Sequence, residues 1–127
     1  MAVQKTGDGI FEKLSDYLII DVRSPGEYAH AHIPTAFSLP LFTDEERAEI
    51  GTTYKQESRE AAIKLGLPFF GTKMQNMIEQ AEGWAANYEK TNGNKPTILV
   101  HCWRGGMRSA AVSWLLDLYG FKTEQLS

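Results

Sequence analysis

The residues that could do chemistry gather in one stretch, His101-Cys102-Trp103-Arg104-Gly105-Gly106-Met107-Arg108-Ser109. Cys102 is the only cysteine among the 127 residues, so the chain can form neither an internal disulfide nor a multi-thiolate metal site. The thiol follows an apolar, β-branched run, and a helix is expected to begin within the next few residues. In an open α/β sheet, this carboxyl end of a strand is where ligands bind.

The loop after Cys102 has the composition of an anion-binding loop. Gly105 and Gly106 let the backbone curl so that successive amides point inward. The N-terminus of the next helix adds free N–H groups and a partial positive charge. Arg104 and Arg108 add two fixed positive charges. A lone cysteine is more often an inert core residue, but these neighbours favour the thiolate and predict a nucleophile held in an anion-binding loop over residues 103–108.

Other side chains near this loop have less certain roles. Asp21 and Arg23 end the first apolar run and should lie near the loop, where we expect Arg23 to pair with Glu27 and Asp21 to bond loop amides. His101 precedes the nucleophile, so strand alternation should point it to the opposite face. Trp103 could stack on a nucleobase, line an apolar channel or fill the core.

The elements that must position this loop alternate between strand and helix. Strands are expected at 17–22, 36–39, 97–102 and 121–126. Helices are expected from Pro25, from Thr43 with an interruption at Gly51, over 53–65, over 72–88 and, after the loop that follows Cys102, up to Gly120. Gly66 should cap the 53–65 helix and Pro68 should prevent its continuation. In the last helix, Ala110, Ala111, Trp114, Leu115 and Leu118 should form the buried face. This alternation predicts an α/β fold with a parallel sheet and helices on both faces.

Composition and charge narrow the class of protein. The length fits one domain, and 43% hydrophobic with 23% charged residues is typical of a globular protein. No apolar run approaches the ~20 residues that span a bilayer, and the first residues lack a signal-peptide core, so no membrane partner and a cytoplasmic location are expected. Because the net charge is −3, most contacts to the phosphates of any RNA partner are expected to come from residues outside this chain.

Two groups of motifs carry a resemblance to a known family. Asp21-Val22-Arg23-Ser24-Pro25-Gly26-Glu27-Tyr28 and His32-Ile33-Pro34 resemble the rhodanese family, and residues 44–66 and 102–109 resemble the N-terminal rhodanese domain of the bacterial tRNA 2-selenouridine synthases. The resemblance implies a single rhodanese-like domain over residues 1–127 with a five-stranded parallel sheet. It also implies that Cys102 carries sulfur or selenium as a per-chalcogenide.

The resemblance further implies substrates and partners. Enzymes of this kind replace the sulfur of 2-thiouridine at the tRNA wobble position with selenium from selenophosphate; a sulfane-sulfur compound is the other expected donor. No further cofactor is implied for these residues. Their second domain carries a P-loop, whose G-x-x-x-x-G-K-[ST] motif is absent from this sequence. The sequence therefore looks like a fragment of such a protein, with tRNA expected to bind through the missing domain.

Two other function classes stay open. Five residues lie between Cys102 and Arg108, and the resulting H-C-x5-R pattern is that of cysteine-dependent phosphatases. Such a phosphatase needs a carboxylate to protonate its leaving group, and Asp44, Glu45 and Glu46 are available. The third class is a non-catalytic rhodanese-like module that binds a partner; it usually lacks the cysteine or the charged loop.

Overall fold

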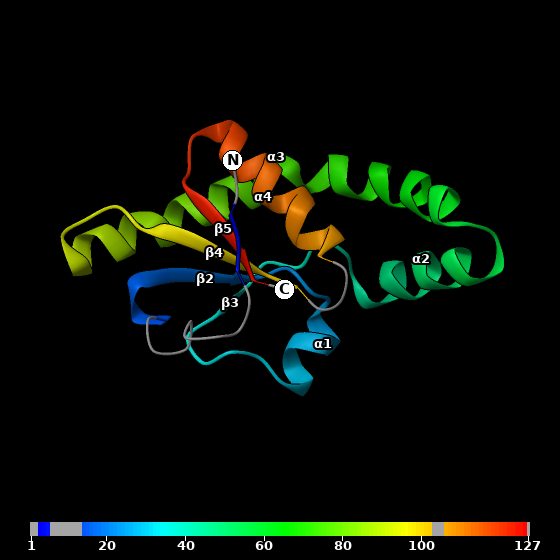
Figure 1. The fold of residues 1–127 in the computed structure, drawn as a ribbon, viewed down its shortest axis with the longest axis horizontal. Helices are drawn as coiled ribbons and strands as arrows, with labels where there is room; N and C mark the ends of the chain where they lie inside the picture. The colour runs from blue at the N-terminus through cyan, green and yellow to red at the C-terminus, as the bar shows by residue number, and fades with distance from the viewer. Residues whose placement is uncertain (1–2, 6–13, 103–105, 127) are drawn as a thin grey trace.

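A parallel sheet lies at the centre of the molecule (Figure 1). The computed structural model describes residues 3–5, 14–102 and 106–126. Within them the strands are Val3–Lys5 (β1), Tyr17–Asp21 (β2), Phe37–Ser38 (β3), Thr97–His101 (β4) and Thr123–Leu126 (β5). Their order is β1-β5-β4-β2-β3, and every neighbouring pair is parallel. The expected five-stranded parallel sheet is confirmed, and β4 lies at its middle.

Helices cover both faces of the sheet, as predicted. They are Pro25–His30 (α1), Asp44–Gln56 (α2), Arg59–Asn92 (α3) and Met107–Tyr119 (α4). Figure 1 shows α3 and α4 on one side of the sheet and α1 on the other, while α2 runs beside the first part of α3. Because every strand runs in the same direction, the carboxyl ends of β2 and β4 meet at one edge, beside α1 and the start of α4.

The core has two parts because the central strands are buried on both faces. The larger cluster joins alternate strand residues, Ile20 and Val100 among them, to the inner sides of α3 and α4. The smaller cluster places Ile19 and Leu99 against the α1 side, where Tyr28 packs on them. An apolar run without alternation is typical of such strands, which explains why the sequence predicted β2 and β4 within a residue.

The predicted breaks between the middle helices are wrong. α2 continues through Gly51 to Gln56, and α3 runs without a break through Gly66 and Pro68. Gly66 is buried, and a Cβ on it would lie 3.1 Å from Cζ of Phe42, so this glycine permits close packing and caps nothing. Pro68 lies on the exposed side of α3, as does Lys64, whose carbonyl group loses its helical N–H partner to the proline. The break falls instead before Arg59, where the Ser58 hydroxyl accepts a hydrogen bond from the Ala61 amide at 3.0 Å.

The predicted buried face of α4 is also wrong in part. Trp114 is 55% exposed and Leu118 is 70% exposed. The buried residues of α4 are Ser109, Val112, Ser113, Leu115 and Leu116. Two serines on the inner face let this helix approach the sheet closely, which apolar periodicity alone does not reveal because α4 carries apolar residues on both sides.

Candidate active site

Cys102 lies directly after β4, at the carboxyl edge of the sheet. The residue is 1% exposed and belongs to the larger core cluster, with Val100 of the same strand and Val112 of α4. The sulfur therefore lies under the first turn of α4. Its placement matches the strand–loop–helix arrangement predicted from the sequence.

The first turn of α4 supplies hydrogen-bonding groups to the sulfur. Gly106 is the N-cap with φ of 69°, a left-handed conformation that favours glycine, and it turns the chain into the helix. The backbone N–H of Ser109 then donates to Sγ of Cys102 over 3.3 Å. This N–H is one of those that a helix leaves unpaired at its N-terminus, where the helix dipole also favours negative charge. The N-terminus of α4 would therefore stabilise negative charge placed on this sulfur.

The Ser109 side chain also faces the sulfur. Its Oγ lies 3.1 Å from Sγ of Cys102, which donates to it as a thiol. The same Oγ lies 3.0 Å from the carbonyl oxygen of Gly106 and 3.3 Å from Oε1 of Gln125, both of which accept from it. The sulfur thus contacts both polar groups of Ser109.

Asp21 and Arg23 form a buried ion pair at the end of β2. Nε and Nη2 of Arg23 donate to the Asp21 carboxylate over 2.8–3.2 Å, and Nη2 also donates to the carbonyl oxygen of Ala31 at 2.6 Å. The hydrogen bonds to Asp21 raise the pKa of Arg23 above its usual value, and the charge of Cys102 acts in the same direction. The two residues therefore lie near Cys102, as expected, but the expected pairing of Arg23 with Glu27 is wrong, since Arg23 pairs with Asp21.

Glu27 pairs with Arg108 instead. Nη1 of Arg108 donates to Oε1 of Glu27 at 2.7 Å, and Nη2 donates to Oε2 at 3.3 Å. Burial alone would raise the pKa of Glu27, but hydrogen bonds from Arg108 and Ser24 outweigh it and lower the pKa from 4.5 to about 2. This pair ties α1 to the start of α4. The guanidinium expected to bind a substrate anion is thus already engaged by a carboxylate, and its anion-binding role stays a prediction.

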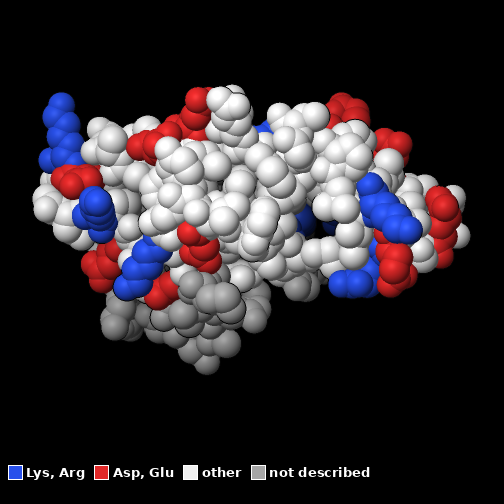
Figure 2. All heavy atoms as spheres, turned by 90° about the horizontal axis from the view of Figure 1, so that it is seen from above, with Lys and Arg blue, Asp and Glu red and all other residues white. Residues whose placement is uncertain are grey.

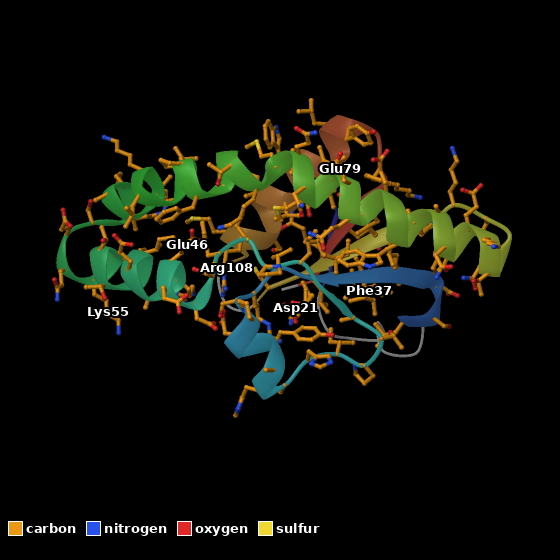
Figure 3. The ribbon with its side chains drawn as sticks, turned by 180° about the vertical axis from the view of Figure 1, so that it is seen from behind. Asp21, Phe37, Glu46, Lys55, Glu79 and Arg108 are labelled. Carbon is orange, nitrogen blue, oxygen red and sulfur yellow. The ribbon has the colours of Figure 1, made fainter. Side chains whose placement is uncertain are left out.

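Of the loop residues not yet discussed, the structure describes only Met107. Trp103, Arg104 and Gly105 lie outside the described residues. Met107 begins α4 and is 48% exposed. Figure 3 shows Asp21 and Arg108 toward the same end of the sheet, near α1.

The carboxylates suggested for a phosphatase acid are mostly engaged elsewhere. Oδ1 of Asp44 accepts the backbone N–H of Gly26 at 2.9 Å. Glu46 accepts the N–H of Thr43 at 2.9 Å and pairs with Lys73, and Figure 3 shows it near the start of α2. Glu45 is exposed in the first turn of α2. Each bond to Asp44 and Glu46 stabilises the start of a helix or its packing.

Val100 and Cys102 belong to the core cluster on the α3 and α4 side, whereas Leu99 belongs to the smaller one, so alternation along β4 assigns His101 to the face opposite Cys102. Burial lowers the pKa of His101 below its usual value, which favours the neutral ring at pH 7. Its Nδ1 is buried without a hydrogen-bond partner among the described residues. The ring is therefore part of the packing at the end of β4.

Sequence reasoning missed three residues at the site. Ser109 appeared only as the last residue of the loop motif, and Glu27 was expected to pair with Arg23 rather than with Arg108. Gln125 carried no signal, because β5 was recognised only as a strand. The position of Ser109 in the first turn of a helix that follows the nucleophile could have indicated its role.

Charge on the surface is mixed. On the face shown in Figure 2, Lys and Arg side chains lie among Asp and Glu side chains, with no area where the basic ones alone gather. Across the described ranges, none of the helices is long and apolar enough to cross a membrane.

Comparison with known proteins places this site in a family. The model of the rhodanese-like domain matches residues 10–126. The tRNA 2-selenouridine synthase of Aeromonas salmonicida is 42% identical over 103 residues, which are 80% of this chain and 26% of that protein. The same enzyme of Nitrosomonas europaea is 41% identical over 106 residues, 82% of this chain and 26% of its own length. The chain thus spans about a quarter of the length of the curated relatives it matches.

A solved structure shares both fold and sequence. The N-terminal domain of a Clostridium difficile 630 protein described as ATP/GTP binding superposes with a TM-score of 0.82 and 33% identity, covering 100% of this chain and 91% of that one. A rhodanese-related protein from Thermoplasma volcanium, with a TM-score of 0.52 and 15% identity over 98% of this chain and 83% of its own, shares the fold. The chain belongs to the family of rhodanese-like domains.

Proposed function

We propose that this domain carries a sulfur or selenium atom on Cys102 as a per-chalcogenide, as part of a tRNA 2-selenouridine synthase. The observation that carries the proposal is the position of Sγ, which receives the Ser109 amide at the N-terminus of α4. An anionic sulfur at this position would keep the hydrogen bond from the Ser109 amide, and the thiolate is the nucleophilic form of cysteine. Similarity of about 40% to named tRNA 2-selenouridine synthases supports the same function.

The loading step can be written for thiosulfate as the donor. The Cys102 thiolate attacks the outer sulfur of thiosulfate, and a new S–S bond forms. The bond between the two sulfurs of thiosulfate breaks, and its electron pair leaves with sulfite. Cys102 is left with a terminal anionic sulfur, and the total charge is unchanged. Selenosulfate reacts in the same way and leaves selenium on the cysteine.

The described residues position this reaction rather than add a second nucleophile. Ser109 holds the sulfur from one side, and the Asp21–Arg23 pair fixes the end of β2 next to it. The Arg108–Glu27 pair holds the start of α4 against α1. Together these contacts fix the end of β2 and the start of α4 around Cys102.

The natural donor and acceptor follow from the family resemblance. We propose selenophosphate or a sulfane-sulfur compound as the donor and the wobble 2-thiouridine of tRNA as the acceptor. The net charge of −3 argues that this domain contributes little to RNA affinity by itself. In the longer relatives, the remaining length could supply those contacts, and a tRNA substrate would place the protein in the cytoplasm.

The test is the intact mass of the purified chain after incubation with thiosulfate or selenosulfate and removal of the reagent. We expect one added chalcogen on the wild type and none on Cys102→Ser, which has the same shape at that position. Hydrolysis of p-nitrophenyl phosphate is measured in parallel with both proteins. Absence of an adduct together with cysteine-dependent phosphate release would overturn the proposal in favour of a phosphatase. Absence of both would indicate a module that only binds.

A further inference from the structure

The Ser109 hydroxyl lies within hydrogen-bonding distance of more acceptors than it can donate to at once. It has one proton, while Gly106 O at 3.0 Å and Gln125 Oε1 at 3.3 Å both accept from it. The Cys102 thiol in turn donates its proton to Oγ at 3.1 Å. In this arrangement no proton of the hydroxyl points at the sulfur, so the arrangement suits a neutral thiol.

A negatively charged sulfur requires the opposite direction. Once the thiol has released its proton to solvent, Sγ can only accept, and the Ser109 hydroxyl must rotate to donate to it. Oγ then needs a new donor because it has lost the thiol proton. Gln125 can supply one: the two ends of its amide have nearly the same shape, and a half-turn brings the NH2 group to Oγ in place of the oxygen.

We propose that Gln125 is a positioning residue for the nucleophile, which acts through Ser109 and favours the anionic state of Cys102 by donating to the Ser109 hydroxyl in that state. Gln125 lies on β5 opposite Val100 in the ladder, on the face that α4 covers, and its side chain reaches the Ser109 hydroxyl there. The inference deepens the proposed function, since it concerns the same thiolate.

The fold offers a matched control for this contact. Thr123, also on β5, donates from Oγ1 to Oδ1 of Asp117 on α4 over 2.7 Å. It therefore joins the same strand to the same helix as Gln125 does, but toward the far end of α4 from Cys102. If the bonds between β5 and α4 were purely structural, loss of the Gln125–Ser109 bond and loss of the Thr123–Asp117 bond would have the same effect on the reactivity of the Cys102 thiol.

The experiment is the rate of iodoacetamide alkylation of Cys102 as a function of pH. We expect the midpoint of the profile to rise by about one pH unit in Ser109→Ala, because a hydrogen bond to a charged group is lost. Gln125→Met should raise it by a smaller amount, and Gln125→Glu, which can only accept, should raise it more. Thr123→Val should leave it unchanged, and Ser109→Thr should keep the wild-type midpoint.

The double variant decides whether Gln125 acts through Ser109. If it does, Ser109→Ala with Gln125→Met has the midpoint of Ser109→Ala alone. The proposal would be overturned if the double variant shifted the midpoint by the sum of the two single shifts. It would also be overturned if neither Gln125 variant moved the midpoint, or if Gln125→Met and Thr123→Val moved it equally. Alkylation requires no chalcogen donor, so a failure of thiosulfate loading with the expected midpoints would refute the proposed function and leave this inference standing.

Discussion

Replacement of Glu27 by Gln should destabilise the protein at neutral pH and have a smaller effect in acid. Hydrogen bonds from Arg108 and Ser24 outweigh the effect of burial and lower the pKa of Glu27 from 4.5 to about 2. At about 1.36 kcal/mol for each pH unit, this drop corresponds to an upper figure of about 3.4 kcal/mol. The side chain is 22% exposed, so water screens part of the interaction. We therefore expect Glu27→Gln to lower the free energy of unfolding at pH 7 by about 1–2 kcal/mol.

The pH dependence has a definite sign. The pKa of Glu27 is lower in the folded chain than in the unfolded one, so its contribution is complete above pH 4.5 and is lost as the pH falls toward 2. Urea unfolding followed by tryptophan fluorescence at pH 7, 5, 4 and 3 measures the difference between wild type and Glu27→Gln. That difference should be constant down to about pH 5 and decrease below it.

A second glutamate provides the control for this experiment. Glu60 pairs with Arg59 at 3.9 Å, but its side chain is 72% exposed. Glu60→Gln should leave the unfolding free energy unchanged within error at every pH. The reasoning would be refuted if Glu27→Gln changed the unfolding free energy as little as Glu60→Gln does. It would also be refuted if the effect of Glu27→Gln were the same at pH 7 and at pH 3.

The fold supports three further predictions about stability. A Cβ on Gly71 would meet no atom within 4 Å, so Gly71→Ala should stabilise α3 by about 0.5–1 kcal/mol. A Cβ on Gly66 would lie 3.1 Å from Phe42, so Gly66→Ala should instead lower the free energy of unfolding by about 1 kcal/mol. If urea unfolding showed that Gly71→Ala and Gly66→Ala change stability in the same direction, this packing would be contradicted. Asp21→Asn removes the charge that pairs with buried Arg23 and should cost about 3 kcal/mol in the same assay, whereas a loss no larger than that of an exposed pair would mean that Arg23 finds another partner.

Strands at the centre of the sheet were predictable because their burial leaves a direct mark on the sequence. β2 and β4 are buried on both faces and read as continuous apolar runs. β1 was not predicted, since Val3–Lys5 is short and two of its three residues are polar. Only the family resemblance gave the correct number of strands.

Helix boundaries were less predictable because local preference competes with tertiary packing. Gly66 and Pro68 are the residues that most often end helices, yet α3 passes through both. The cost of the proline is reduced by its exposure, and the glycine permits contact with Phe42. Neither fact can be read from the sequence around these residues, because Phe42 lies outside α3.

The site was predictable in position but not in its pairings. The strand before Cys102 and the helix after it indicated where the thiol would lie, and the structure places it there. The partner of Arg108 was not predictable, because Glu27 is distant in the sequence and the nearby Arg23 was the expected partner of Glu27. Bonds between residues so far apart depend on how α1 and α4 approach each other, which no local motif encodes.

The order of the strands also has a consequence for how the chain folds. β2 pairs with β4, whose first residue follows that of β2 by 80 positions, and β1 pairs with β5 across nearly the whole chain. Closing such long segments is entropically costly, so folds dominated by these contacts form slowly. β4, which precedes Cys102, can join β2 only after α1, α2 and α3 have been synthesised. During synthesis the Cys102 thiol is therefore buried later than the residues of these three helices can begin to pack.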